Sequence, residues 1–233
     1  MSISVDLRQS FGQHNAQHIE QARAWLALSE CGSHTTALSY AALELRFAIE
    51  RLALEYWRAI LNRPVTEADL HTASSFKRIE RQIYDLAGHQ REINLHFEFM
   101  AMLVAELKID VPVVAPQLGR LSSYWHECSE LCHVVWPIAS SAPQLSQKVF
   151  HGLTEMVEEV ALPNSSVRWG TFHEEKLDKL RNEFVAGRAS LDEARAYLRS
   201  VGVWAKVDYP DGRPSHFVGE AIPPSSPPPD SSQ

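Results

Sequence analysis

An arginine and a histidine five positions apart, Arg91 and His96, have the side chains that best fit acid-base chemistry on a phosphate. They stand in the stretch REINLH, residues 91–96, within a segment of helical periodicity. A guanidinium can bind a phosphate through two hydrogen bonds and neutralise developing charge, and an imidazole can transfer a proton near neutral pH. The pair is therefore a candidate site for phosphate binding and proton transfer.

The geometry of a helix leaves a second interpretation of this pair open. Residues five apart on a regular helix point about 140° away from each other, so they converge only at a helix end or across a dimer. Alternatively, Arg91 and Glu92 are solvated, and His96 lies at the margin of the core next to Phe97.

A second polar pair occurs in the stretch SSYWHECSELCHVVWP. Ser129 and His133 are four residues apart, so on a helix they share a face and can form a hydrogen bond. The alternative is that the neighbouring apolar residues face the core and the polar pair only fixes the packing.

Two groups of side chains resemble sets of metal ligands. One helical face carries His89, Glu92 and His96, and the other group consists of His126, Cys128, Cys132 and His133. A carboxylate-bridged site in a bundle needs a repeated Glu-x-x-His motif, which the sequence lacks, and the second group would not converge on one tetrahedron. We therefore expect no metal and no cofactor.

The Arg91 and His96 motif gives the chain a resemblance to the HEPN superfamily over residues 14–160. The bundles of four or five helices in that superfamily often carry an arginine, four to six intervening residues and a histidine. A pattern of Trp125, Ser129 and His133 also resembles one seen late in some HEPN-like proteins. In the nucleases of the superfamily, two subunits bring two motifs together over RNA and cleave it without a metal.

The resemblance implies that Arg91 binds the phosphate and that His96 is the general acid or base. Active members commonly have a small polar residue after the arginine, whereas this sequence has Glu92. Its negative charge would repel the phosphate that Arg91 attracts. This departure favours a member without catalytic activity.

Helical patterns fill the region that must position these residues. Residues 37–61 carry one apolar stripe at alternating steps of four and three, and residues 16–30 carry another, with CGSHTT as the turn between them. Further helices are predicted over 67–107, with a break at Ala87-Gly88, over 118–136 and over 141–160. Residues 109–117 contain two prolines and indicate an extended link.

The fold class predicted from these patterns is mainly α. We expect an HEPN-like helical bundle over 1–163 and a small α+β appendage over 164–220, which joins a helical hairpin to a β-hairpin. The appendage loosely resembles C-terminal modules that mediate self-association, although it can equally be a solvated helical pair that closes one end of the bundle. Residues 221–233 are rich in proline and serine and are expected to be disordered.

Composition excludes several classes of protein. The chain of 233 residues has 45% apolar residues and a formal charge of −7, so no global excess of base attracts nucleic acid or anionic membrane. It has no secretory signal and no apolar run of about 18 residues, so we expect a cytoplasmic protein without membrane contact. Cys31, Cys128 and Cys132 are expected to be reduced. Glycine-rich phosphate loops, GxSxG, HExxH and paired CxxC motifs are missing.

Two functions remain as hypotheses, and they leave open whether the chain is an enzyme. The first is a catalytically silent interaction protein that binds itself or a protein partner, in a bacterial toxin-antitoxin or defence setting as the resemblance implies. The second is a metal-independent endoribonuclease that uses Arg91 and His96 across a dimer, with RNA as its partner.

Overall fold

The computed structural model describes residues 7–61, 66, 76–110, 112–133, 142–165, 175–201, 205–207 and 216–218. The chain divides into two compact units, one formed by 1–94 with 114–169 and the other by 95–113 with 170–233. The segment 95–113 therefore groups with residues late in the sequence. These units are groups of residues in contact, and the domain boundaries expected from the sequence stay a prediction.

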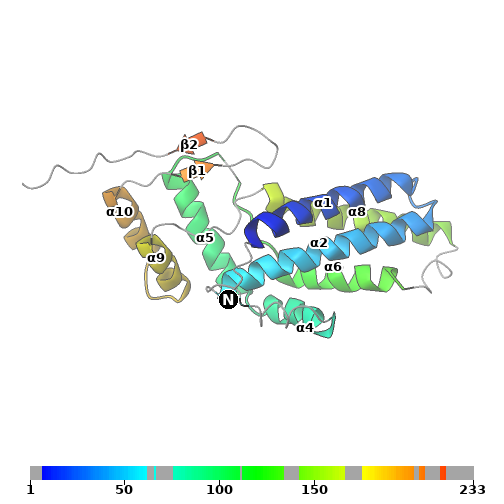
Figure 1. Ribbon diagram of the computed structural model, residues 1–233, viewed down its shortest axis with the longest axis horizontal. Coiled ribbons are helices and arrows are strands. Elements are labelled where there is room, and N and C mark those ends of the chain that lie inside the picture. Colours follow the sequence, from blue (N-terminus) through cyan, green and yellow to red (C-terminus); the bar gives the residue numbers. More distant parts are fainter. Residues whose placement is uncertain are drawn as a thin grey trace, which may run out of the picture. The chain divides into compact units, whose positions relative to one another are not determined.

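The first unit is a bundle of α-helices, which confirms the predicted fold class. The long helices of this unit lie alongside one another in Figure 1, and α2 contacts α1, α6 and α8 as well as the shorter α4. The helices of this unit are α1 (Leu7–Leu28), α2 (Thr35–Leu61), α4 (Phe76–Ala87), α6 (Leu118–Leu131) and α8 (Pro143–Ser165). Helix α5 (Gln90–Glu106) begins in this unit and continues into the second.

The apolar stripes predicted for α1 and α2 form the core of the bundle. On α2 the fully buried residues of the stripe are Leu38, Ala42, Leu45, Ile49 and Leu52. Helix α1 meets them with Ile19, Ala22 and Leu26, which are also buried. Each large apolar side chain buried in this way contributes roughly 1.5–3 kcal/mol to stability. Burial of one face per helix therefore holds the pair together.

The turn between α1 and α2 depends on Gly32. Its φ of 94° lies in the left-handed region, and a Cβ atom at this position would stand 2.7 Å from the backbone oxygen of Ser146 in the first turns of α8. The Ser29 hydroxyl donates to the Leu26 carbonyl and accepts from the Gly32 amide, which closes the turn. A glycine is required here both for its φ and for the close approach of α8.

The break predicted at Ala87-Gly88 separates α4 from α5. The first residue of α5, Gln90, also begins α6: its Oε1 accepts a hydrogen bond from the Leu118 backbone N–H at 2.7 Å, and its Nε2 donates to the Pro116 carbonyl at 2.8 Å. Gln117 gives α6 no side-chain cap. A glutamine from another helix thus satisfies one of the amides that a helix start leaves unpaired.

Several helix ends differ from the sequence-based bounds, and α1 begins at Leu7, nine residues before the predicted segment that starts at Ala16. Helix α8 continues to Ser165 and so includes Pro163, which can be accommodated in a last turn at the loss of one backbone hydrogen bond. Helix α6 ends at Leu131, five residues before the predicted end. Residues 134–141 lie outside the described residues.

The second unit contains most of α5 together with α9 (Glu175–Val185) and α10 (Leu191–Val201). Two short strands, β1 (Ala205–Val207) and β2 (His216–Val218), pair antiparallel with Lys206 opposite Phe217. Helix α10 begins with a capping box, since the Ser190 hydroxyl accepts from the Glu193 amide and the Glu193 carboxylate accepts from the Ser190 amide. The predicted disordered tail, 221–233, lies outside the described residues.

Candidate functional site

Arg91 lies in the first turn of α5 and is exposed to solvent. Glu92 follows it, and its carboxylate stands 3.8 Å from the Nδ1 of His89. A negative charge in a first turn stabilises the helix through its dipole. Glu92 therefore has a structural role and also places a negative charge beside the candidate phosphate ligand.

His96 lies on the same helix and is completely buried. Burial lowers the pKa of His96 from its ordinary value of 6.5 to about 2, and the positive charge of the Arg181 guanidinium acts in the same direction. The ring also makes an edge-to-face contact with Phe97 at 5.8 Å between centroids. His96 is therefore a neutral imidazole in the interior of the second unit.

Arg181 is a buried cation on α9, and the Asp178 carboxylate lies 2.7 Å from its Nη2. Its Nη2 also donates to the side-chain oxygen of Asn182 at 3.1 Å. Burial lowers the pKa of Arg181, and Asp178 opposes that shift. The guanidinium contacts Asp178 and Asn182 of its own helix, and its positive charge adds to the effect of burial in lowering the pKa of His96.

The structure does not bring Arg91 and His96 together within one chain. Arg91 is exposed, whereas His96 is enclosed, and the helix between them turns the two side chains in different directions. A general acid or base must reach the proton that it transfers, so His96 would have to leave the interior to act. The catalytic roles of the two residues stay a prediction.

Ser129 and His133 also remain apart. The Ser129 hydroxyl donates to the Trp125 carbonyl at 2.7 Å, a bond within its own helix. His133 lies beyond the end of α6 and is exposed. The hydrogen bond considered for this pair therefore goes to the backbone, as serine side chains in helices commonly do.

The described residues hold a polar cluster that the sequence did not indicate, between α2 and α6. Glu50 Oε1 accepts from the Nε of Arg46 at 3.0 Å and from the indole Nε1 of Trp125 at 2.9 Å. The Arg46 guanidinium stands over the Trp125 ring, 5.3 Å from its centroid. Because Glu50 neutralises Arg46 and satisfies the buried indole, the cluster fixes the two helices together.

Two cysteines lie beside this cluster, and both are poor nucleophiles. Burial raises the pKa of Cys128 above that of an ordinary thiol. Burial also raises the pKa of Cys132, although the Arg46 guanidinium lowers it in part. Protonated thiols react slowly, so the arrangement does not indicate cysteine chemistry.

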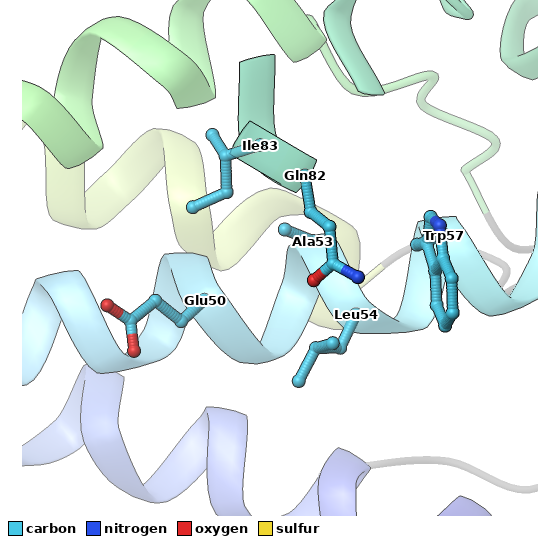
Figure 2. A pocket seen from close by; sticks show the side chains of 6 residues that line it. All are labelled: Glu50, Ala53, Leu54, Trp57, Gln82 and Ile83. Atoms are coloured by element: carbon cyan, nitrogen blue, oxygen red, sulfur yellow. The ribbon is translucent and has the colours of Figure 1, made fainter. Parts of the chain in front are cut away.

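A small pocket opens between α2 and α4 (Figure 2). Glu50 and Trp57 stand at opposite ends of its α2 side, and the Gln82 side chain extends from α4 toward Ala53 and Leu54. The cavity volume is about 10 Å³, which is the space of one water molecule. It is too small for an organic substrate.

Metal ligands do not converge in the part of the chain that the structure describes. Among those residues, no group of three His, Cys, Asp or Glu side chains is arranged to hold an ion. The faces proposed from spacing, around His89 and around Cys128, are therefore not assembled into a site there.

The described surface of the first unit carries an aromatic seam, which we define as His18 and Trp25 of α1 with Tyr40 and Phe47 of α2. The rings of Trp25 and Tyr40 stack at 4.8 Å between centroids, and those of His18 and Phe47 meet at 5.5 Å with a tilt of 50°. Tyr40 is 48% exposed and Phe47 is 37% exposed. The two ring pairs stand seven residues apart on both helices.

The spacing of the aromatic seam was available in the sequence. A search for apolar stripes finds the residues that face the core, whereas Tyr40 and Phe47 lie on another side of α2. Seven residues make nearly two helical turns, so aromatic residues at that spacing on both helices of an antiparallel hairpin pair across it. Helix pairing and aromatic spacing together would have identified the seam.

A polar contact lies at the His18 end of the seam. The Nδ1 atom of His18 lies 2.6 Å from the Glu44 carboxylate, with both side chains about one-fifth exposed. Leu28, near the Trp25 end, is 60% exposed. The seam thus combines exposed apolar rings with a fixed polar contact, a composition typical of protein contact surfaces.

Two further findings bear on the identity of the chain. None of the described helices has the length and apolar character that a membrane span requires. Comparisons of the chain with protein-family models, with curated proteins and with solved structures found no match.

Proposed function

We propose that this chain is a catalytically silent helical interaction protein that associates with further copies of itself through the aromatic seam. The observation that carries the proposal is the exposure of Tyr40 and Phe47 on a helix whose opposite face is fully buried. Large aromatic rings are enriched at contact surfaces because they bury much apolar area with little loss of side-chain freedom.

Two features support an interaction role over RNA cleavage. His96 is buried and neutral, so it neither reaches a substrate nor exchanges a proton near neutral pH. Glu92 adds a negative charge next to Arg91. The HEPN-like affiliation and the toxin-antitoxin or defence setting enter the proposal only through the sequence resemblance.

The test is the mass of the purified chain in solution, measured by light scattering over a range of concentrations. We expect a mass above the 26.3 kDa of one chain. The double variant Tyr40→Ala/Phe47→Ala should return to the monomer mass with unchanged circular dichroism. Tyr84→Ala is the matched control, because Tyr84 is 47% exposed on α4 and lies outside the seam. A wild-type monomer at every concentration would overturn the proposal.

A further inference from the structure

The last residues of the sequence contain a segment whose chemistry fits the aromatic seam. Residues 221–233 read AIPPSSPPPDSSQ and lie outside the described residues. Proline fixes φ near −65°, so such segments favour the polyproline II helix and lose little entropy on binding. Aromatic surfaces are the usual partners of proline-rich helices, because flat rings pack against the pyrrolidine ring.

The distance between the aromatic residues of the seam agrees with the distance between two prolines of the segment. Tyr40 and Phe47 are seven residues apart on α2, which corresponds to about 10.5 Å along the helix axis. Pro224 and Pro227 are the only prolines of the segment three residues apart, which corresponds to about 9.3 Å in polyproline II. One turn of an ideal polyproline II helix therefore matches the distance between the two ring pairs of the seam to within about 1 Å.

The seam also offers hydrogen-bond donors for the ligand. A polyproline II helix has no internal hydrogen bonds, so its carbonyls need outside donors when they are covered. Gln21 stands between His18 and Trp25 on α1 and is exposed, and Tyr40 carries a hydroxyl. Both side chains can donate to carbonyls of the bound segment.

We propose that the aromatic seam binds residues 221–233 of a second copy of the chain. This inference deepens the proposed function and rests on it for the claim that the seam joins copies. It names the occupant of the surface, a proline-rich segment, and the two prolines that contact the rings.

Calorimetry with a synthetic peptide of residues 221–233 tests the occupant directly. The receptor is the full chain with Pro224→Ser and Pro227→Ser, so that its own tail does not compete. We expect saturable binding with one peptide per chain, and at least about tenfold weaker binding when Tyr40→Ala and Phe47→Ala are added, which is about 1.4 kcal/mol or more. Tyr84→Ala should leave the affinity unchanged.

A second peptide keeps the test independent of receptor folding. The same peptide with serine in place of Pro224 and Pro227 should not bind the receptor, which is unchanged in that comparison. Equal binding of both peptides, or no saturable binding of the natural one, would overturn the inference.

Light scattering on the tail variant separates this inference from the proposed function. If the full chain with Pro224→Ser and Pro227→Ser becomes monomeric while the wild type is oligomeric, both hold. An oligomer that persists in the tail variant retains the proposed function and rejects the tail as occupant. A wild type that is always monomeric, with a peptide that binds at the seam, rejects self-association and assigns the seam to the tail of the same chain.

Discussion

Solvation decides what His96 can do. The residue type and the distance in sequence from Arg91 indicate acid-base chemistry, but burial, with the nearby Arg181 guanidinium, lowers the pKa of His96 to about 2, so its imidazole does not take up a second proton near neutral pH. The side chain then acts as a neutral polar ring in the interior of the second unit. The burial of His96 lowers the free energy of unfolding at acid pH, because the imidazole is protonated in the unfolded chain and stays neutral in the folded chain.

We expect His96 to make folding stability depend on pH. Its folded pKa is about 2, below its ordinary value of 6.5, so the unfolded state binds more protons at acid pH. Stability is therefore complete above pH 6.5 and falls by up to about 1.4 kcal/mol for each pH unit below it. Urea unfolding at pH 7, 6 and 5 should show this loss in wild type and a smaller loss in His96→Gln.

His151→Gln is the control for this pH dependence, since His151 is exposed on α8 and its removal should leave the acid loss unchanged. An equal loss of unfolding free energy from pH 7 to pH 5 in wild type and in His96→Gln would contradict the assignment of a buried neutral His96.

The depth of His96 could not be derived from its local sequence. Its neighbours in sequence place it only at the margin of an apolar stripe, whereas Arg181, which shares its surroundings, lies 85 positions later. By contrast, Leu38 and Ile49 could be assigned to the core from spacing alone, because burial along one helix face follows from periodicity. Contacts between distant segments need the tertiary structure.

At the scale of elements, the turn between α1 and α2 contains one backbone position on which the close packing of α8 depends. Gly32 combines a left-handed φ with the close approach of Ser146. Gly187, after α9, has a similar φ of 73°, but a Cβ there would meet nothing within 4 Å. The two glycines separate the cost of the backbone conformation from the cost of the steric contact.

Substitution of Gly32 by alanine should destabilise the chain far more than the same change at Gly187. The left-handed conformation costs about 1–2 kcal/mol for alanine at either site, and only Gly32→Ala also forces a backbone contact apart. We expect Gly32→Ala to cost at least about 2 kcal/mol more than Gly187→Ala in the free energy of urea unfolding.

Gly152→Ala is a reference variant that should raise stability, whereas the other two substitutions lower it. Gly152 lies inside α8 with nothing within 4 Å of an added Cβ, so alanine should stabilise the helix by about 0.5–1 kcal/mol. Similar losses at Gly32 and Gly187 would show that α8 does not pack closely on the turn.

Much of the element structure was predictable, and the exceptions have physical causes. The hairpin of α1 and α2, the break at Gly88 and the cap at Ser190 follow from periodicity and local hydrogen bonding. The passage of α8 through Pro163 does not, because a local rule against proline in helices can be outweighed by the packing of the preceding turns. The Glu50 contact with Trp125 joins residues 75 positions apart, and no local pattern encodes it.

At the scale of the whole molecule, charge and burial bear on RNA in the same direction. The chain has 22 Lys and Arg against 29 Asp and Glu, and RNA binding depends on local neutralisation of phosphates. Arg91 is exposed and able to contact a phosphate, but it stands beside Glu92. An exposed arginine alone can bind a phosphate of RNA without cleaving the RNA.

The full chain should therefore leave unstructured RNA intact in buffer that contains EDTA. The reason is that metal-free cleavage needs an accessible general acid or base, and His96 is buried and neutral between pH 5 and 8. Gel analysis of labelled RNA after long incubation at several pH values checks this, with a metal-free ribonuclease as positive control. Cleavage by the wild type that Arg91→Ala abolishes would contradict the expectation, since that exposed substitution leaves the core unchanged. It would mean that Arg91 takes part in RNA cleavage, and the nuclease hypothesis would then replace the silent one.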